Sequence, residues 1–253
     1  MPADIKLLQK YLARIKKVYE REIKREDGNS GFLIRSGKII EELHEYLKHE
    51  IVKNGIKRTY INPPLGKSSP EKAIDGYFKT KDQDILIQKE ENQPLISLNI
   101  RSQLSSVQKN YDTLFERLVA ESVNIHEKFP QVPCGYLYLL PAIGYDSDAM
   151  KENKVVRNER FNWEKYLTTF SLLADRKNLE DKTFKYEKIC LLAVDFSANP
   201  PYVLSSTEDF LSRKLITEDF AKRFDYSPLK VDDIIEKLLA TFNHRNKVSM
   251  SRL

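Results

Sequence analysis

Four polar residues near the middle of the chain have types and spacing suited to binding a charged group. Asp84 begins the apolar run 84–88, while Asn99, Arg101 and Gln103 alternate with other residues at the end of a second run. A period of two places the last three on one face of a strand. If the two runs form a hairpin, Asp84 lies across from Asn99 and Arg101. A guanidinium at position 101 could bind a phosphate or stabilise negative charge, but could not act as a general base.

More polar side chains follow the second run, where we expect a helix to begin. They are Gln103, Ser105, Ser106, Lys109 and Asn110. Hydroxyls, amides and free backbone N–H groups at the start of a helix can bind phosphate oxygens. An ordinary serine cap followed by a solvated first turn explains the same residues. Both interpretations stay open at the level of the sequence.

The strands that must position these residues follow from the hydrophobic pattern. Segments 73–80, 84–88 and 94–102 are short and closely spaced, which predicts a three-stranded antiparallel meander. Apolar residues at steps of three and four predict a helix over 106–128. The nearly all-apolar run 135–143 predicts a strand that is covered on both faces.

The remaining segments complete a mixed sheet flanked by helices. The run 186–196 reads as a second buried strand, and the polar stretch 144–160 as a long surface loop. Further helices are expected over 4–26, 37–53, 162–174, from 207 onward, and over 231–242. The predicted fold class is therefore α/β (α+β), with a mixed β-sheet of about five strands.

This arrangement resembles the PD-(D/E)XK nuclease superfamily, in particular type II restriction endonucleases of the XhoI kind. The likeness covers about residues 73–142 and is carried by DQDILI, IRSQLSSVQKN and a later E-R pair. It implies a restriction-endonuclease-like fold. The chain would be a single domain 1–253 with an N-terminal helical addition 1–55, a nuclease-like core 73–142, and a C-terminal α/β and helical part 143–253.

The resemblance also implies roles for individual residues. Asp84 matches the family's metal-binding aspartate, Asn99 its glutamate, and Arg101 the lysine that orients the attacking water. Asp84 and Asn99 would then hold Mg²⁺, and Arg101 would contact the scissile phosphate. The E-x-K signature is changed to N-x-R, and an amide oxygen without charge should bind Mg²⁺ less tightly. Either another carboxylate replaces the missing glutamate, or the site is degenerate.

Two glutamates of the expected helix 106–128 could supply that carboxylate. Glu116 falls where XhoI-like sequences also carry a glutamate. At about 100° per residue, Glu121 lies about 40° from the centre of the apolar stripe and Glu116 about opposite. Glu121 is the better geometric candidate and Glu116 the better sequence match. Either could equally be a surface glutamate paired with Lys or Arg.

Charge and composition limit the function without choosing one. The net charge is +5, from 42 Lys+Arg against 37 Asp+Glu, which is compatible with an anionic partner. Arg157 and Arg160 could add DNA contacts, although a solvated charged surface explains them as well. No apolar run approaches the roughly 18 residues of a membrane span, so we expect a soluble cytoplasmic protein with no membrane contact.

The sequence leaves three functional hypotheses. No Gly-rich phosphate loop, G-x-S-x-G elbow or zinc signature is present. The first hypothesis is an Mg²⁺-dependent type II restriction enzyme, a homodimer that cuts palindromic double-stranded DNA, with a cognate DNA methyltransferase encoded nearby. The alternative is a catalytically degenerate nuclease-fold protein that binds DNA without cutting it. The third is a purely structural subunit.

Overall fold

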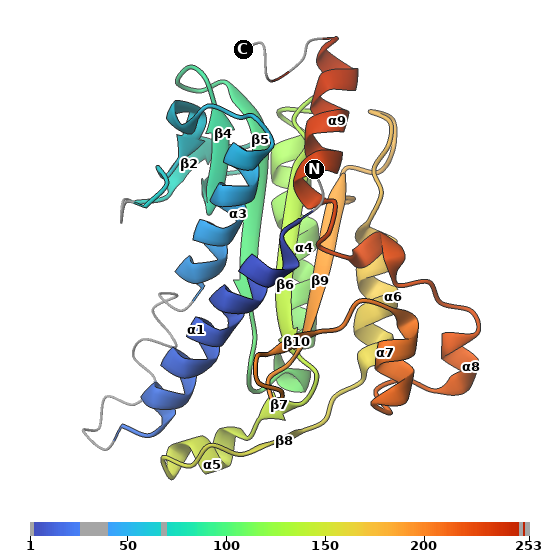
Figure 1. Cartoon of the computed structure of the whole chain (residues 1–253). Coiled ribbons are helices and arrows are strands. Elements are labelled where there is room, and N and C mark those ends of the chain that lie inside the picture. The colour runs from blue at the N-terminus through green and yellow to red at the C-terminus, as the bar shows by residue number, and fades with distance from the viewer. Residues whose placement is uncertain (1–2, 26–39, 67–69, 248–249, 251–253) are drawn as a thin grey trace.

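The computed structural model describes residues 3–25, 40–66, 70–247 and 250, and combines helices with strands (Figure 1). The helices are α1 (Ile5–Ile23), α3 (Glu41–Lys53), α4 (Tyr111–His126), α5 (Ser147–Lys151), α6 (Trp163–Leu173), α7 (Thr207–Ser212), α8 (Glu218–Ala221) and α9 (Ile234–Asn246), with 3₁₀ turns η1 (Arg58–Tyr60), η2 (Gln108–Asn110) and η3 (Ser227–Leu229). The strands are β1 (Ile61–Asn62), β2 (Lys72–Asp75), β3 (Thr80–Gln83), β4 (Ile85–Gln88), β5 (Pro94–Ser102), β6 (Cys134–Pro141), β7 (Gly144–Tyr145), β8 (Arg157–Glu159), β9 (Lys188–Asp195) and β10 (Tyr202–Val203).

A six-stranded mixed sheet forms the centre of the fold, in the order β1-β4-β5-β6-β9-β10. Strands β4 and β5 form an antiparallel hairpin, and β6 and β9 then extend the sheet in parallel. Helix α4 connects β5 to β6, and α6 lies between β6 and β9, as parallel neighbours require crossover connections. The expected mixed sheet flanked by helices is confirmed in this general form.

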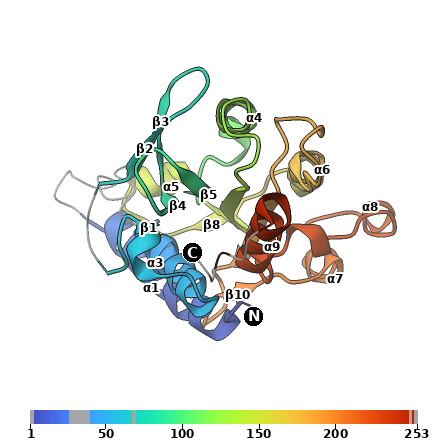
Figure 2. The ribbon, with the colours of Figure 1, turned by 90° about the horizontal axis from the view of Figure 1, so that it is seen from above.

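Helices cover both faces of this sheet, as the view in Figure 2 shows. One face carries α4 and α6, and the other carries α1, α3 and α9. Alternation along the strands explains the two cores: Leu137 and Leu139 of β6 belong to one hydrophobic cluster, whereas Tyr136 and Tyr138 belong to the other. The sheet is therefore buried on both sides, which accounts for its nearly continuous apolar strands.

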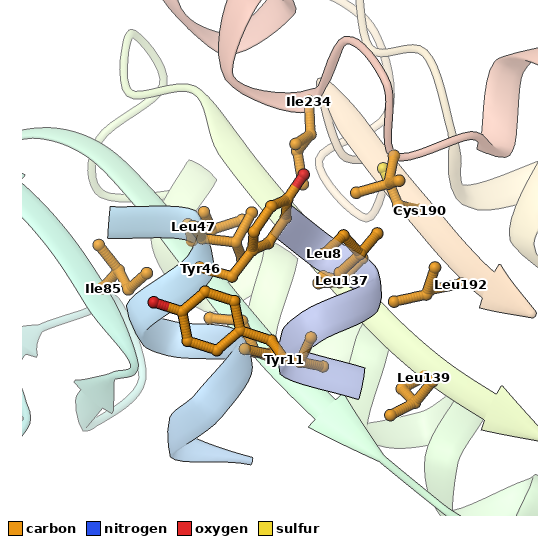
Figure 3. Close-up of a cluster of buried hydrophobic side chains, with 14 of the residues drawn as sticks. Leu8, Tyr11, Tyr46, Leu47, Ile85, Leu137, Leu139, Cys190, Leu192 and Ile234 are labelled. Carbon is orange, nitrogen blue, oxygen red and sulfur yellow. The ribbon is translucent and has the colours of Figure 1, made fainter. Parts of the chain in front are cut away.

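Helix α1 packs against the sheet because its apolar residues recur on one side. It begins at Asp4, whose side chain accepts a hydrogen bond of 2.9 Å from the Leu7 N–H. Leu8 and Tyr11 of α1 lie beside Tyr46 of α3 and face Leu137 of β6 in the buried cluster of Figure 3. The expected helix over 4–26 is confirmed as far as Ile23, and position 26, like positions 37–39 of the second expected helix, lies outside the described residues.

The expected meander over 73–80, 84–88 and 94–102 is only partly correct. Strands β4 and β5 do pair, but β2 pairs with β3 in a separate two-stranded ribbon, and β4 has β1 as its other neighbour. The reason is polarity: β3 reads Thr-Lys-Asp-Gln and buries only its last residue, Gln83. Such a strand cannot occupy a sheet position that is covered on both faces.

Two further expectations are corrected by local structure. The stretch 144–160, expected to be a loop, contains the paired strands β7 and β8 and the short helix α5 between them. Asp146 starts α5 by accepting hydrogen bonds from the Asp148 and Ala149 N–H groups. The helix expected from position 106 begins with the turn η2, and α4 follows from Tyr111, because Ser106 has a φ of 52°. Among the described residues, no helix combines the length and apolarity needed to cross a membrane.

Candidate active site

The β4–β5 hairpin brings Asp84 and Asn99 together, as the sequence predicts. The Asp84 N–H donates to Asn99 Oδ1 over 3.2 Å, and the Ile100 N–H donates to Asp84 Oδ2 over 2.5 Å. Both side chains lie on the face of the sheet that α4 covers, where Asn99 is paired with Tyr136 of β6. Asp84 is thereby fixed from two sides, which suits a carboxylate that must hold a ligand in a defined position.

The Asn99 side chain acts as a bridge between the strands. Its Oδ1 accepts from the Asp84 backbone, and its Nδ2 donates to Gln83 Oε1 over 3.1 Å. Gln83 Oε1 also accepts from Ser97 Oγ at 2.5 Å. The atom expected to bind Mg²⁺ is thus already directed at a backbone N–H. The geometry favours a positioning role for Asn99 and leaves the ligand role to carboxylates.

Glu121 of α4 is the glutamate that reaches this site. It is 8% exposed, and its Oε1 lies 3.0 Å from Lys81 Nζ and 3.9 Å from Arg101 Nη2. Glu116, the better sequence match, is exposed on α4. The helical angle therefore located Glu121 correctly on the buried side, because Leu114 and Leu118 of the same helix pack on the sheet.

Several polar atoms of the site are buried without a hydrogen-bond partner in the described part of the chain. They are both carboxylate oxygens of Glu121, the Nε of Arg101 and the hydroxyl of Tyr136. Lys81 and Arg101 lie within ion-pair distance of Glu121, but neither side chain donates a hydrogen bond to it. Buried polar groups in folded proteins almost always have a partner, so this gap marks the place where a polar ligand or ordered water belongs.

A second carboxylate, Glu71, lies against Asp84. Burial raises the pKa of Asp84, while the Ile100 N–H and the charge of Arg101 oppose that rise. Burial also raises the pKa of Glu71, and the charge of Asp84 and a hydrogen bond between the two carboxyl groups raise it further. Two carboxylates this close favour sharing either a proton or a cation.

The groups around Arg101 stabilise its positive charge. Burial works against the guanidinium, but Tyr136, Asp84 and Glu121 outweigh it and raise the pKa of Arg101. The side chain is 39% exposed, so part of it reaches solvent while its Nε stays buried. Arg101 is thus a permanent cation placed between the carboxylates and the exterior.

Sequence reasoning missed Glu71 and Lys81. Glu71 lies directly before β2, and Lys81 lies on β3, so both depend on the two-stranded ribbon. The ribbon in turn is held at Asn124 of α4, which accepts from the Phe78 and Lys79 N–H groups over 2.8 and 3.1 Å. No local sequence pattern predicts this contact between Asn124 and the ribbon. The only available signal was the odd-even alternation that puts Lys81 and Gln83 on one face.

The residues present suit Mg²⁺. It prefers oxygen ligands and usually binds through one or two carboxylates. Asp84, Glu71 and Glu121 offer such oxygens, and the two oxygens of Glu121 lack hydrogen-bond partners among the described residues. Asp84 and Glu71 are the better ligands of the three, because Lys81 and Arg101 already balance the charge of Glu121.

The polar residues after β5 surround a cavity of about 400 Å³ next to the site. Arg101, Gln103, Ser105 and Asn110 all line it. Two of them are engaged within the loop: Gln103 Nε2 and Asn110 Nδ2 both donate to the Ser106 carbonyl, over 2.8 and 2.9 Å. Ser106 therefore contributes its backbone to the loop, while Lys109 is exposed outside the cavity lining.

One N–H group at the start of the helix and one expected DNA contact, Arg157, have partners within the chain. The Val107 N–H donates to Glu159 Oε1 over 2.7 Å, so a carboxylate of the chain itself occupies this position at the start of the helix. Arg157 binds Glu20 Oε1 over 2.7 Å and stacks over Tyr145. Arg160 is exposed.

A separate cluster, His126, Cys134 and Glu187, has ligand atoms within 4.8 Å of one another. Both oxygens of Glu187 are already used: Oε2 by His126 Nε2 and the Cys134 N–H, and Oε1 by Arg176 and Arg245. Two guanidinium groups this close would repel a cation. The cluster is therefore a buried ion network that stabilises the fold.

Comparisons with models of known protein families, with curated proteins and with solved structures found no match.

Proposed function

We propose that the chain is an Mg²⁺-dependent endonuclease of the PD-(D/E)XK kind that hydrolyses phosphodiester bonds in double-stranded DNA, as type II restriction enzymes do. The observation that carries the proposal is the pair of buried carboxylates Asp84 and Glu121 near Arg101, with the exposed Glu71 against Asp84. Both oxygens of Glu121 and the Nε of Arg101 lack hydrogen-bond partners among the described residues. Carboxylates beside a phosphate-binding cation are what metal-assisted phosphodiester hydrolysis needs.

The fold is compatible with this class. An antiparallel hairpin, a crossover helix and a parallel strand surround the site in the order β4, β5, α4, β6. The resemblance of 73–142 to restriction endonucleases implies the same order. The fold alone does not decide function, so the proposal depends on the residues of the site.

Each residue has a distinct part in the proposed reaction. Asp84 and Glu71 hold Mg²⁺, which when bound supplies positive charge against the negative charge that develops on the phosphate. Arg101 binds a phosphate oxygen and cannot take up a proton. Lys81, 3.0 Å from Glu121, is held where it can donate to the same phosphate. Asn99 keeps Asp84 in place.

The experiment compares substitutions at matched positions. Mixed plasmid and phage DNA is incubated with Mg²⁺ or Mn²⁺, and discrete fragments are expected from the wild type. Asp84→Asn should lower cleavage by about a hundredfold or more, since a metal ligand is lost. Asp219→Asn, the same change at an exposed aspartate of α8 paired with Lys222, should leave cleavage unchanged.

A second matched pair lies on α4. Glu121→Gln should lower cleavage strongly, whereas Glu116→Gln should not, because only Glu121 faces the site. If Glu116→Gln had the larger effect, or if Asp84→Asn cleaved like the wild type, the proposed site would be wrong. Tm measurements on each variant show whether a loss of cleavage reflects unfolding.

The alternative is a nuclease-fold protein that binds DNA without cutting it. It is favoured by Asn99, whose oxygen accepts from a backbone N–H, and by the two cations that lie within ion-pair distance of Glu121. It predicts salt-sensitive duplex binding, no cleavage with any divalent ion, and no metal binding by calorimetry.

The proposed restriction role carries two further expectations. A palindromic target calls for a homodimer, which sedimentation on DNA would show as two chains per duplex. A neighbouring gene for a DNA methyltransferase would be expected to protect the host DNA.

A further inference from the structure

The cavity of about 400 Å³ at the end of β5 is lined by two cations, of which one, Arg117, has no part in the proposed cleavage site. Arg101 of β5 and Arg117 of α4 both line it. Among the described residues, no aspartate or glutamate lines the cavity, and no carboxylate lies within ion-pair distance of Arg117. The charge of the cavity is therefore complementary to an anion.

The charges of Arg101 and Arg117 both act on Tyr138, a residue of the cavity wall. Burial raises the pKa of the Tyr138 hydroxyl, and the charges of Arg101 and Arg117 oppose this rise. Tyr138 itself donates to Gln103 Oε1 over 2.8 Å, so its position is fixed. Arg101 and Arg117 thus face a common polar surface from two different elements, β5 and α4.

Helix α4 places Arg117 in line with the proposed active site. Thr113, Arg117 and Glu121 recur at intervals of four, which puts them on one side of the helix. Thr113 and Arg117 line the cavity, and Glu121 lies at the site itself. One turn of helix rises about 5.4 Å, so the cavity continues the site along α4.

The size of the cavity also fits more than a lone ion. Sites for small organic ligands typically enclose about 300–1,000 Å³. Gln103 and Asn110 line it, but their amide N–H groups are directed at the Ser106 carbonyl, so they shape the wall. The charged donors offered to a ligand are the guanidinium of Arg117 and the exposed part of the Arg101 guanidinium, and the hydroxyls of Ser102 and Thr113 also line the cavity.

We propose that this cavity binds the phosphate next to the scissile phosphate on the same DNA strand, and that Arg117 is its principal contact. This inference rests on the proposed function for the identity of the strand. Arg101 then lies between two successive phosphates, and Arg117 recognises the outer one by paired N–H···O bonds. Arg117 sets the position of the strand and takes no part in the chemical step.

The test measures binding in EDTA, so that it does not depend on cleavage. Thymidine 3′,5′-bisphosphate, which presents two phosphates on one nucleoside, is titrated by calorimetry and compared with thymidine 5′-monophosphate and thymidine. The bisphosphate is expected to bind most tightly. Arg117→Gln should weaken it roughly tenfold or more, towards the affinity of the monophosphate, and leave thymidine unchanged.

A matched variant removes the same charge elsewhere. Arg223, next to α8, is exposed and does not line the cavity, so Arg223→Gln should bind the bisphosphate like the wild type. Equal weakening in both variants would show only a loss of net charge, and would overturn the inference. Binding of the bisphosphate no tighter than that of thymidine would overturn it as well.

The outcome also separates this inference from the proposed function. If wild-type protein cleaves DNA while Arg117→Gln leaves bisphosphate binding unchanged, the cavity proposal fails and the nuclease proposal stands. If no cleavage occurs but Arg117→Gln weakens the bisphosphate as expected, the cavity proposal stands and the DNA-binding alternative is favoured.

Discussion

At the scale of single residues, the altered signature Asn99-x-Arg101 can be tested by restoring its usual form. Asn99 bridges the Asp84 N–H and Gln83 Oε1, so a glutamate there would set its oxygen against the Gln83 oxygen. We expect Asn99→Glu with Arg101→Lys to lower the free energy of unfolding by about 1–3 kcal/mol and to give no gain in cleavage. Urea unfolding and the plasmid assay measure the two effects.

The opposite result has a clear meaning. A large gain of cleavage in the restored variant would show that the natural chain is degenerate and that Glu121 is not its substitute. Arg101→Lys alone is the control, because it changes the cation without disturbing the bridge between the strands.

At the scale of elements, the β2–β3 ribbon depends on one side chain of α4. Asn124 accepts from the Phe78 and Lys79 N–H groups and donates to the Lys79 carbonyl over 3.0 Å. A Cβ at Gly76 would come within 2.2 Å of Asn124 Nδ2, so a glycine is needed where the two elements meet. The ribbon carries Lys81 to Glu121, and its attachment to α4 therefore positions part of the site.

Asn124→Ala should loosen the ribbon and the site together. It removes three partly buried hydrogen bonds, which should cost about 1–3 kcal/mol in urea unfolding, and it should lower cleavage while the protein remains folded. Amide exchange at Phe78 and Lys79 should accelerate. Asn246→Ala, at an exposed asparagine, should change stability by no more than about 0.5 kcal/mol. Unchanged amide exchange in Asn124→Ala would contradict the anchoring role.

The elements also show what the sequence could predict. Alternation in β5 and the length of its hairpin correctly placed Asp84 beside Asn99, and the helical angle correctly placed Glu121, because both depend on local periodicity. Glu71 and Lys81 could not be foreseen, since they reach the site only after the polar ribbon leaves the main sheet. The cavity at Arg117 likewise forms from β5 and α4 after they pack.

At the scale of the whole molecule, Glu187 joins segments from across the fold. Its carboxylate binds His126 of α4, the Cys134 N–H of β6, Arg176 after α6 and Arg245 of α9. The side chains of Glu187, His126 and Arg176 are all 0% exposed. No periodic pattern in the sequence links these positions, so the network could be seen only in the folded chain.

This network should govern how the protein responds to acid. Burial alone would raise the pKa of Glu187, but His126, Arg245 and the Cys134 N–H outweigh it and lower the pKa from 4.5 to about 2. A carboxyl whose pKa is lower in the folded state stabilises the protein fully above pH 4.5. That contribution is lost as the pH falls from about 4.5 to about 2.

Glu187→Gln should therefore destabilise the protein by about 3–5 kcal/mol at pH 7, because two buried guanidinium groups lose their counter-charge. Between pH 4.5 and 2 its stability should fall less steeply than that of the wild type, so the two curves should converge. Urea unfolding at a series of pH values measures both effects. Glu180→Gln, at an exposed glutamate, controls for the loss of one negative charge. Parallel curves for Glu187→Gln and the wild type would mean that the acid response arises elsewhere, because a group contributes to the slope only if its pKa differs between the folded and the unfolded state.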